Sequence, residues 1–128
     1  RYEYKNKGLD VFLEAMGKLN QVKQLNKDII AFILVPAWIK GPRADLQNRI
    51  KLNSPNVNSA LDRPYLTHWL HEIQHDPIVN QINYLNMHNQ KEDKVKIIFV
   101  PSYLTGDDGI FNMPYYDLLI GMDVTVFA

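Results

Sequence analysis

The sequence predicts an α/β fold built on a parallel sheet. One observation is a set of apolar runs without polar alternation, typical of strands buried on both faces. The other is that the stretches between these runs carry apolar residues at helical spacing. Buried strands joined by helices form parallel β/α units with right-handed crossovers, so we expect a Rossmann-like sheet in a single partial domain over residues 1–128.

The expected helices are amphipathic. The first, over residues 9–20, has its apolar residues at helical spacing: Leu9, Phe12, Leu13, Met16 and Leu19. Asp76 and Pro77 supply an N-cap and a first-turn proline for a second helix, whose apolar stripe runs to near Asn89. Residues 116–121 are expected to form one or two further turns.

Three parallel strands are expected, over residues 29–35, 95–100 and 123–127. Pro36 and Pro101 end the first two, because proline cannot donate to a sheet ladder. The α/β alternation predicts a further strand before Arg1, so we interpret the chain as a piece of a longer protein. Residues 40–63 are polar and interrupted by Gly and Pro, and we expect a long irregular connection there.

Charge and composition exclude several classes of function. Fourteen basic residues balance fourteen acidic ones, so no nucleic-acid or anionic membrane partner is expected. The longest apolar run, residues 29–36, falls far short of the roughly 20 residues that cross a bilayer. The chain has no Cys, which removes disulfides and thiolate chemistry and fits a cytoplasmic protein.

One short motif matches a known zinc-binding pattern. His71, Glu72 and His75 form an H-E-x-x-H pattern, which on a long helix places two zinc-binding imidazoles beside a general base. Asp76-Pro77 breaks any such helix directly after His75, and we interpret these His as exposed polar residues at a helix end, without a structural zinc. A zinc metallopeptidase stays as an alternative, with His88 or Glu92 as third ligand. At helical spacing, His68, His71 and His75 would share one face.

The opening segment, residues 1–8, lies between the strand expected before Arg1 and the first helix. In an open α/β sheet this position is the carboxyl edge, where ligands bind, and a helix amino end adds backbone donors for anionic oxygens. Arg supplies a planar fork and Lys a compact charge, a pair suited to a diphosphate. Surface charges without a ligand are the alternative.

The same segment carries a family resemblance. Arg-Tyr-Glu-Tyr-Lys-Asn-Lys-Gly, followed by Leu-Asp-Val-Phe-Leu-Glu-Ala, resembles the start of the carboxyl-terminal domain of glycogen synthases of the fungal and animal type. The resemblance covers nearly the whole chain apart from residues 38–64. It continues through residues 31–37, 67–68, 76–78, 95–99 and 126–127.

The resemblance implies a retaining glucosyltransferase with the two Rossmann-like domains of the GT-B type. Such an enzyme transfers glucose from its donor substrate, UDP-glucose, to the non-reducing end of an α-1,4-glucan, and it needs no cofactor. This chain would be the front part of its donor domain. By the same resemblance, Arg1 and Lys7 hold the donor diphosphate. Tyr103 and Tyr115 flank the uracil, with Tyr115 as the stacking ring, and no metal is implied.

Departures from the family limit what this chain does alone. The catalytic Glu-x7-Glu would lie just beyond Ala128, so no catalytic residue is assigned here and the isolated piece is not expected to be active. The region 38–64 is shorter than in eukaryotic relatives, which fits a bacterial relative and leaves a homo-oligomer and allosteric control open. Thr67-His68-Trp69 replaces the family's Thr-His-Asn. The residues leave open whether the donor is UDP-glucose or ADP-glucose. A non-catalytic interaction domain is the remaining alternative function.

Overall fold

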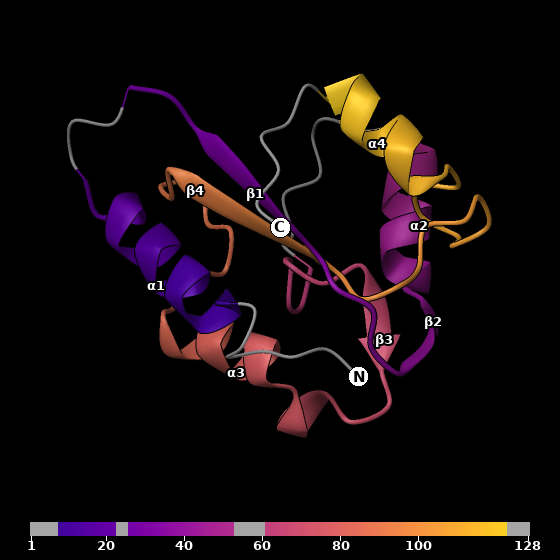
Figure 1. The fold of residues 1–128 in the computed structure, drawn as a ribbon, viewed down its shortest axis with the longest axis horizontal. Helices are drawn as coiled ribbons and strands as arrows, with labels where there is room; N and C mark the ends of the chain where they lie inside the picture. The colour runs from indigo at the N-terminus through magenta and orange to yellow at the C-terminus, as the bar shows by residue number, and fades with distance from the viewer. Residues whose placement is uncertain (1–7, 23–25, 53–60, 123–128) are drawn as a thin grey trace.

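The computed structural model describes residues 8–22, 26–52 and 61–122. Figure 1 shows the arrangement of their helices and strands. In chain order these are α1 Leu9–Asn20, β1 Ile29–Leu34, β2 Ile39–Pro42, α2 Ala44–Leu52, β3 His68–Leu70, the 3-10 turn η1 Ile73–His75, α3 Pro77–Tyr84, β4 Val95–Val100 and α4 Tyr115–Met122.

The centre of the fold is the parallel pair β1 and β4. Their register runs from Ile29 opposite Val95 to Leu34 opposite Val100, which confirms the α/β class and the first two predicted strands. Phe99 also donates to the Tyr65 carbonyl at 2.7 Å and accepts from the Thr67 amide at 3.2 Å. This parallel bridge continues the sheet past β4, at a place where no strand was predicted.

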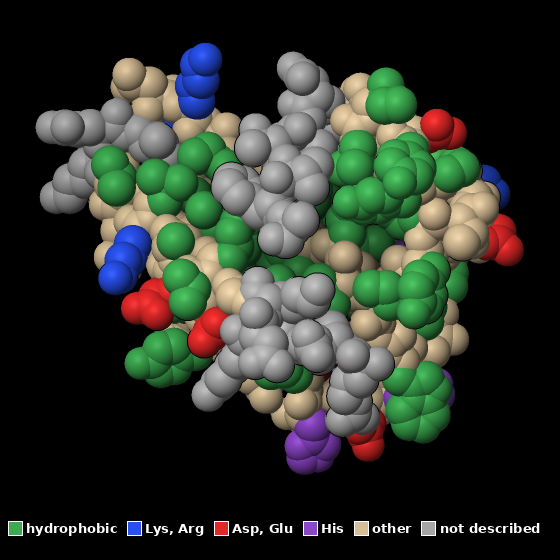
Figure 2. All heavy atoms as spheres, viewed as in Figure 1, with side chains coloured by type: hydrophobic (Ala, Val, Ile, Leu, Met, Phe, Trp, Pro, Cys, Tyr) green, Lys and Arg blue, Asp and Glu red, His purple; other side chains and the backbone are tan. Residues whose placement is uncertain are grey.

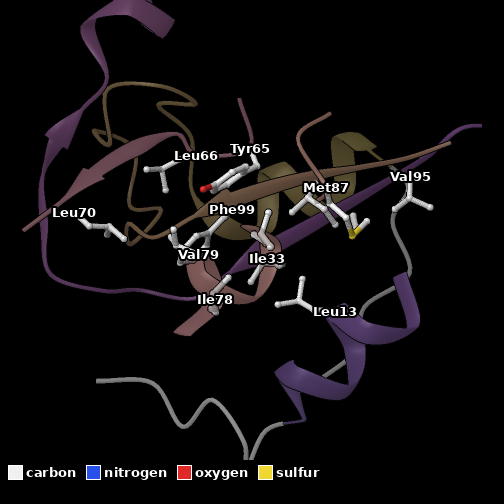
Figure 3. Close-up of a cluster of buried hydrophobic side chains, with 13 residues drawn as sticks. Leu13, Ile33, Tyr65, Leu66, Leu70, Ile78, Val79, Met87, Val95 and Phe99 are labelled. Carbon is white, nitrogen blue, oxygen red and sulfur yellow. The ribbon is translucent and has the colours of Figure 1, made fainter. Parts of the chain in front are cut away.

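Helices α1 and α3 cover one face of this sheet. Figure 1 shows them side by side on one side of the β1–β4 pair. The main core lies between these layers, and Figure 3 shows its side chains converging from α1, α3, both strands and the 65–66 segment. Alternate residues of β4 point into it, which is the period-two pattern of a strand. The central members are Leu13, Ile33, Ile78, Ile82, Ile97 and Phe99.

A smaller cluster lies on the other face. Val100, Leu104 and Leu118 are buried together, with Leu34 and Ile98 packed against them. Helix α4 contributes Leu118, so the two faces of the sheet are covered by different helices. The apolar runs predict strands buried on both faces, but in the described structure the side chain of Ile30 on this second face of β1 is exposed.

Several predicted boundaries are confirmed. Helix α1 spans the expected residues, and α4 covers the turns expected over 116–121. Asp76 caps α3 by accepting a hydrogen bond from the Val79 amide at 3.0 Å. Helix α3 ends at Tyr84 rather than near Asn89, because Asn86 has a left-handed φ of 57° that stops the helix.

The prediction for residues 40–63 is wrong in its first half. Strand β2 pairs antiparallel with β3, and the nine-residue helix α2 follows directly. These elements depend on contacts with distant residues, so local periodicity did not reveal them. The expected strand over 123–127 and the strand expected before Arg1 lie outside the described residues.

Candidate functional site

A pocket of about 170 Å³ opens at the carboxyl ends of β1 and β4. The segments leaving the two strands are joined by a hydrogen bond from the Ala37 amide to the Pro101 carbonyl at 2.8 Å. This edge is where open α/β sheets bind ligands. The pocket is lined by Leu34, Pro36, Ser102, Tyr103, Leu104, Thr105 and Tyr115.

Two residues assigned from the sequence, Tyr103 and Tyr115, line this same pocket. Tyr103 follows β4 and its side chain is 74% exposed, whereas Tyr115 begins α4 and is 38% exposed. A backbone hydrogen bond from the Tyr115 amide to the Leu104 carbonyl, 3.0 Å long, holds the two segments together. Two aromatic side chains therefore line the pocket, and an aromatic face is a surface on which flat rings stack.

The electrostatic character of the pocket is neutral, because none of its seven lining residues is charged. A phosphate group would therefore need cations from outside it. Arg1 and Lys7, which the sequence analysis assigns to a diphosphate, lie outside the described residues. Gly8, the next residue along, precedes α1 with a left-handed φ of 73°.

Exposed apolar side chains continue beyond the pocket. Figure 2 shows hydrophobic side chains gathered where α4 lies in Figure 1. Tyr116 and Ile120 of α4 are exposed, and the Tyr116 ring meets the Tyr115 ring edge-on with 5.6 Å between centroids. The site thus lies at the border of a largely apolar surface.

A turn that the sequence analysis missed leads into Tyr115. The Asp108 carboxylate accepts hydrogen bonds from the amides of Ile110, Phe111 and Asn112, at 3.1, 2.8 and 2.7 Å. The Asn112 side chain in turn accepts from the Gly109 amide at 2.8 Å. The signal was present, since Asp, Gly and Asn in close succession are typical of side-chain-stabilised turns.

The histidines do not form the helical cluster considered from the sequence. His68 is buried in β3, whereas His71 is exposed and stacks on Trp38 with 4.1 Å between ring centroids. His75 ends a 3-10 turn of three residues, so the shared helical face is absent. Among the described residues, no group of three His, Asp or Glu side chains is placed to hold a metal.

Comparison with known proteins bears on the family of this chain. The family model for glycogen synthase matches residues 46–128, which include α3, β4, the Asp108 turn and both pocket tyrosines. The chain belongs to the glycogen synthase family. Nothing in the comparisons or the described structure supports the metallopeptidase alternative.

Curated relatives of this family match over nearly the whole chain. Glycogen (starch) synthase isoform 1 of Saccharomyces cerevisiae is 26% identical over 185 residues, covering 99% of this chain and 26% of the yeast protein. The liver enzyme of Rattus norvegicus is 25% identical over 175 residues, covering 99% and 25%. The glycogen (starch) synthase of Neurospora crassa is 24% identical over 180 residues, covering 100% and 26%.

The chain therefore spans about a quarter of the length of these relatives. The matched stretch of 185 residues in the yeast comparison exceeds the 128 residues of this chain, so the relative carries additional residues inside it. In the part of the chain that the structure describes, no helix is long and apolar enough to cross a membrane.

Proposed function

We propose that the protein containing this chain is a glycogen synthase, which transfers glucose from UDP-glucose to the non-reducing end of an α-1,4-glucan with retention. The chain would supply part of the donor domain and no catalytic carboxylate. The observation that carries the proposal is the placement of Tyr103 and Tyr115 around one pocket at the carboxyl edge of a parallel sheet, in a chain of this family.

Each group in the site has a distinct proposed task. Tyr115 stacks on the uracil and Tyr103 borders it, because a neutral, aromatic pocket suits a base and not a phosphate. Arg1 and Lys7 bind the diphosphate, whose charge grows as the glycosidic bond breaks. The glucan acceptor is bound by the rest of the enzyme. We place the enzyme in the cytoplasm, and a homo-oligomer is compatible with this proposal.

Steady-state kinetics of the full-length enzyme test this function. We expect glucosyl transfer from UDP-glucose. ADP-glucose is assayed in parallel to determine whether the donor base is uracil or adenine. Tyr115→Ala should raise the donor KM about fivefold or more, since base–aromatic stacking is worth roughly 1–3 kcal/mol. Its kcat should stay within about twofold, because stacking is equal in the ground and transition states.

The matched control is Tyr84→Ala. Tyr84 is 87% exposed at the end of α3, and it does not line the pocket, so its loss should leave both constants unchanged. A wild-type enzyme that transfers glucose from neither donor would refute the proposed function. A donor KM that responds equally to both substitutions would refute the base site.

A further inference from the structure

The turn formed by residues 108–112 connects the pocket to a buried histidine in another part of the fold. The His68 side chain is fully buried, and its Nε2 atom lies 2.8 Å from the Asp108 carbonyl oxygen. Because a carbonyl oxygen only accepts, Nε2 must carry the proton of this hydrogen bond. Strand β3 thereby holds the first residue of a turn that lies forty positions along the chain.

The other side of the His68 ring is also fixed. Nδ1 lies 2.7 Å from the Thr67 hydroxyl, and the Thr67 amide donates to Phe99 of β4. The ring is therefore held between the sheet and the turn, and cannot rotate without losing a hydrogen bond in a buried environment. Such a loss is costly because the groups left behind have no water to replace it.

Asp108 transmits this anchoring to the chain that follows. Its side chain is fully buried and accepts from three successive backbone amides, so the direction of residues 110–112 is set by the position of Asp108. Pro114 then bridges to Thr105, and the Tyr115 amide bonds to Leu104. Hydrogen bonds thus link His68 to Asn112, and the chain itself covers the three positions from Asn112 to Tyr115, the first residue of α4.

Helix α2 provides a second attachment for the same turn. The Gln47 side-chain amide donates to the Gly109 carbonyl at 2.9 Å. Gln47 belongs to the helix that the sequence analysis interpreted as an irregular connection. The turn is thus attached to β3 on one side and to α2 on the other, and the chain that leaves it reaches the pocket residue Tyr115 three positions after Asn112.

We propose that His68 is a positioning residue for the nucleotide base: it holds Asp108 so that Tyr115 faces the pocket in the orientation that stacks on uracil. The inference rests on the proposed function, because it concerns the same base site. It assigns a role in donor binding to a side chain that does not line the pocket itself.

The test measures the dissociation constant of UDP for the full-length enzyme by calorimetry. His68→Leu removes the donor to Asp108 and keeps apolar bulk, and we expect UDP to bind about five- to tenfold more weakly, as for loss of one buried hydrogen bond. His68→Gln keeps a side-chain N–H donor for the Asp108 carbonyl, and we expect it to restore most of the affinity.

A double-mutant cycle separates positioning from a general loss of stability. If His68 acts through Tyr115, then adding His68→Leu to Tyr115→Ala should weaken UDP binding by less than about twofold further. Ile82→Val is the structural control, because it removes one methylene from the core on the opposite face of the sheet. It should lower the melting temperature and leave the UDP affinity unchanged.

The remaining outcomes would overturn the positioning role of His68. Equal effects of His68→Leu with and without Tyr115, or no effect at all, would overturn the positioning role while leaving the proposed function intact. If His68→Leu does not fold, Gln47→Ala releases the same turn from its partly exposed side, and unchanged UDP affinity in that variant overturns the inference. A wild-type enzyme that binds no UDP overturns the proposed function and this role together.

Discussion

Arg43 places its guanidinium carbon 4.2 Å from the centre of the Trp69 ring, and the arginine side chain is fully buried. The same guanidinium donates to the carbonyls of Asp62, Arg63 and Leu66 at 2.6, 2.6 and 3.1 Å. It also forms a bidentate pair with Asp45. Arg43 thus joins the start of α2 to the segment that leads into Thr67 and His68.

Replacing Arg43 by Met should lower the free energy of unfolding by roughly 3 kcal/mol, because several carbonyls and one carboxylate lose their buried donor. Lys18→Met is the control, since Lys18 forms an exposed pair with Glu14 and its loss should change stability by less than about 0.5 kcal/mol. Denaturant unfolding of both variants measures the difference. Equal losses would show that the Arg43 network contributes nothing beyond a surface pair.

The pH dependence of the Arg43–Asp45 pair follows from the direction of the shift. The hydrogen bond from Arg43 lowers the pKa of Asp45 below its ordinary value. Stability from this pair is therefore complete above the unfolded pKa of about 3.9 and is lost as the pH falls through the lower folded value. The Asp45 side chain is 43% exposed, so solvent screens the pair and keeps the effect small.

Carbon-detected NMR titration of the Asp45 carboxyl checks this directly. The pKa should lie below about 3.9 in the wild type and return toward that value in Arg43→Met. An Asp45 pKa that does not respond to loss of Arg43 would contradict the assigned cause.

Tyr65 makes the opposite prediction at high pH. Burial raises the pKa of its phenol, and the hydroxyl donates to the Asn83 side chain at 3.0 Å. Its contribution to stability is complete below the unfolded pKa of about 10 and is lost as the pH rises toward the folded value. Tyr65→Phe should cost about 1 kcal/mol at neutral pH and lessen the loss of stability above pH 10. Unfolding curves between pH 7 and 11 compare the two proteins, and parallel losses in both would contradict this role of Tyr65.

Gly109 is expected to be the glycine least tolerant of a side chain in the turn before Tyr115. Its φ is +91°, and a Cβ there would lie 2.6 Å from Cγ of Pro42 in β2. Gly106 has a similar φ of +113° but open space around it. Gly106→Ala should therefore cost only the backbone strain, about 1–2 kcal/mol. Gly109→Ala should cost more stability than Gly106→Ala and should also weaken UDP binding. Equal losses of stability and of UDP affinity in the two variants would contradict the close contact with Pro42.

Arg1 and Lys7 should behave differently from the pocket tyrosines. Contacts to the leaving diphosphate strengthen in the transition state and are worth roughly 2–4 kcal/mol each, so Arg1→Ala or Lys7→Ala should lower kcat on the order of a hundredfold. Steady-state glucosyl transfer by the full-length enzyme measures this. A kcat within about twofold of wild type would show that these residues do not contact the leaving group.

The local sequence determined the elements whose signal is short-range. The spacing of Leu9, Phe12 and Leu13 predicted α1, the apolar runs predicted β1 and β4, and Asp76-Pro77 marked the start of α3. The family resemblance named Tyr103 and Tyr115 together, and both residues line one pocket in the structure, while their contact with the uracil stays a prediction. Each of these signals depends on neighbouring residues, so a single sequence carries it.

Tertiary structure alone decided the remainder. Residues 39–52 lack a helical or alternating apolar pattern, yet they form β2 and α2 because β3, Arg43 and Gln47 supply partners that lie far along the chain. His68 looked like part of an exposed helical cluster, whereas pairing with β2 and a hydrogen bond to Asp108 make it a buried strand residue. Such long-range hydrogen bonds leave no periodic trace in the sequence, because each partner satisfies the other only after the chain has folded.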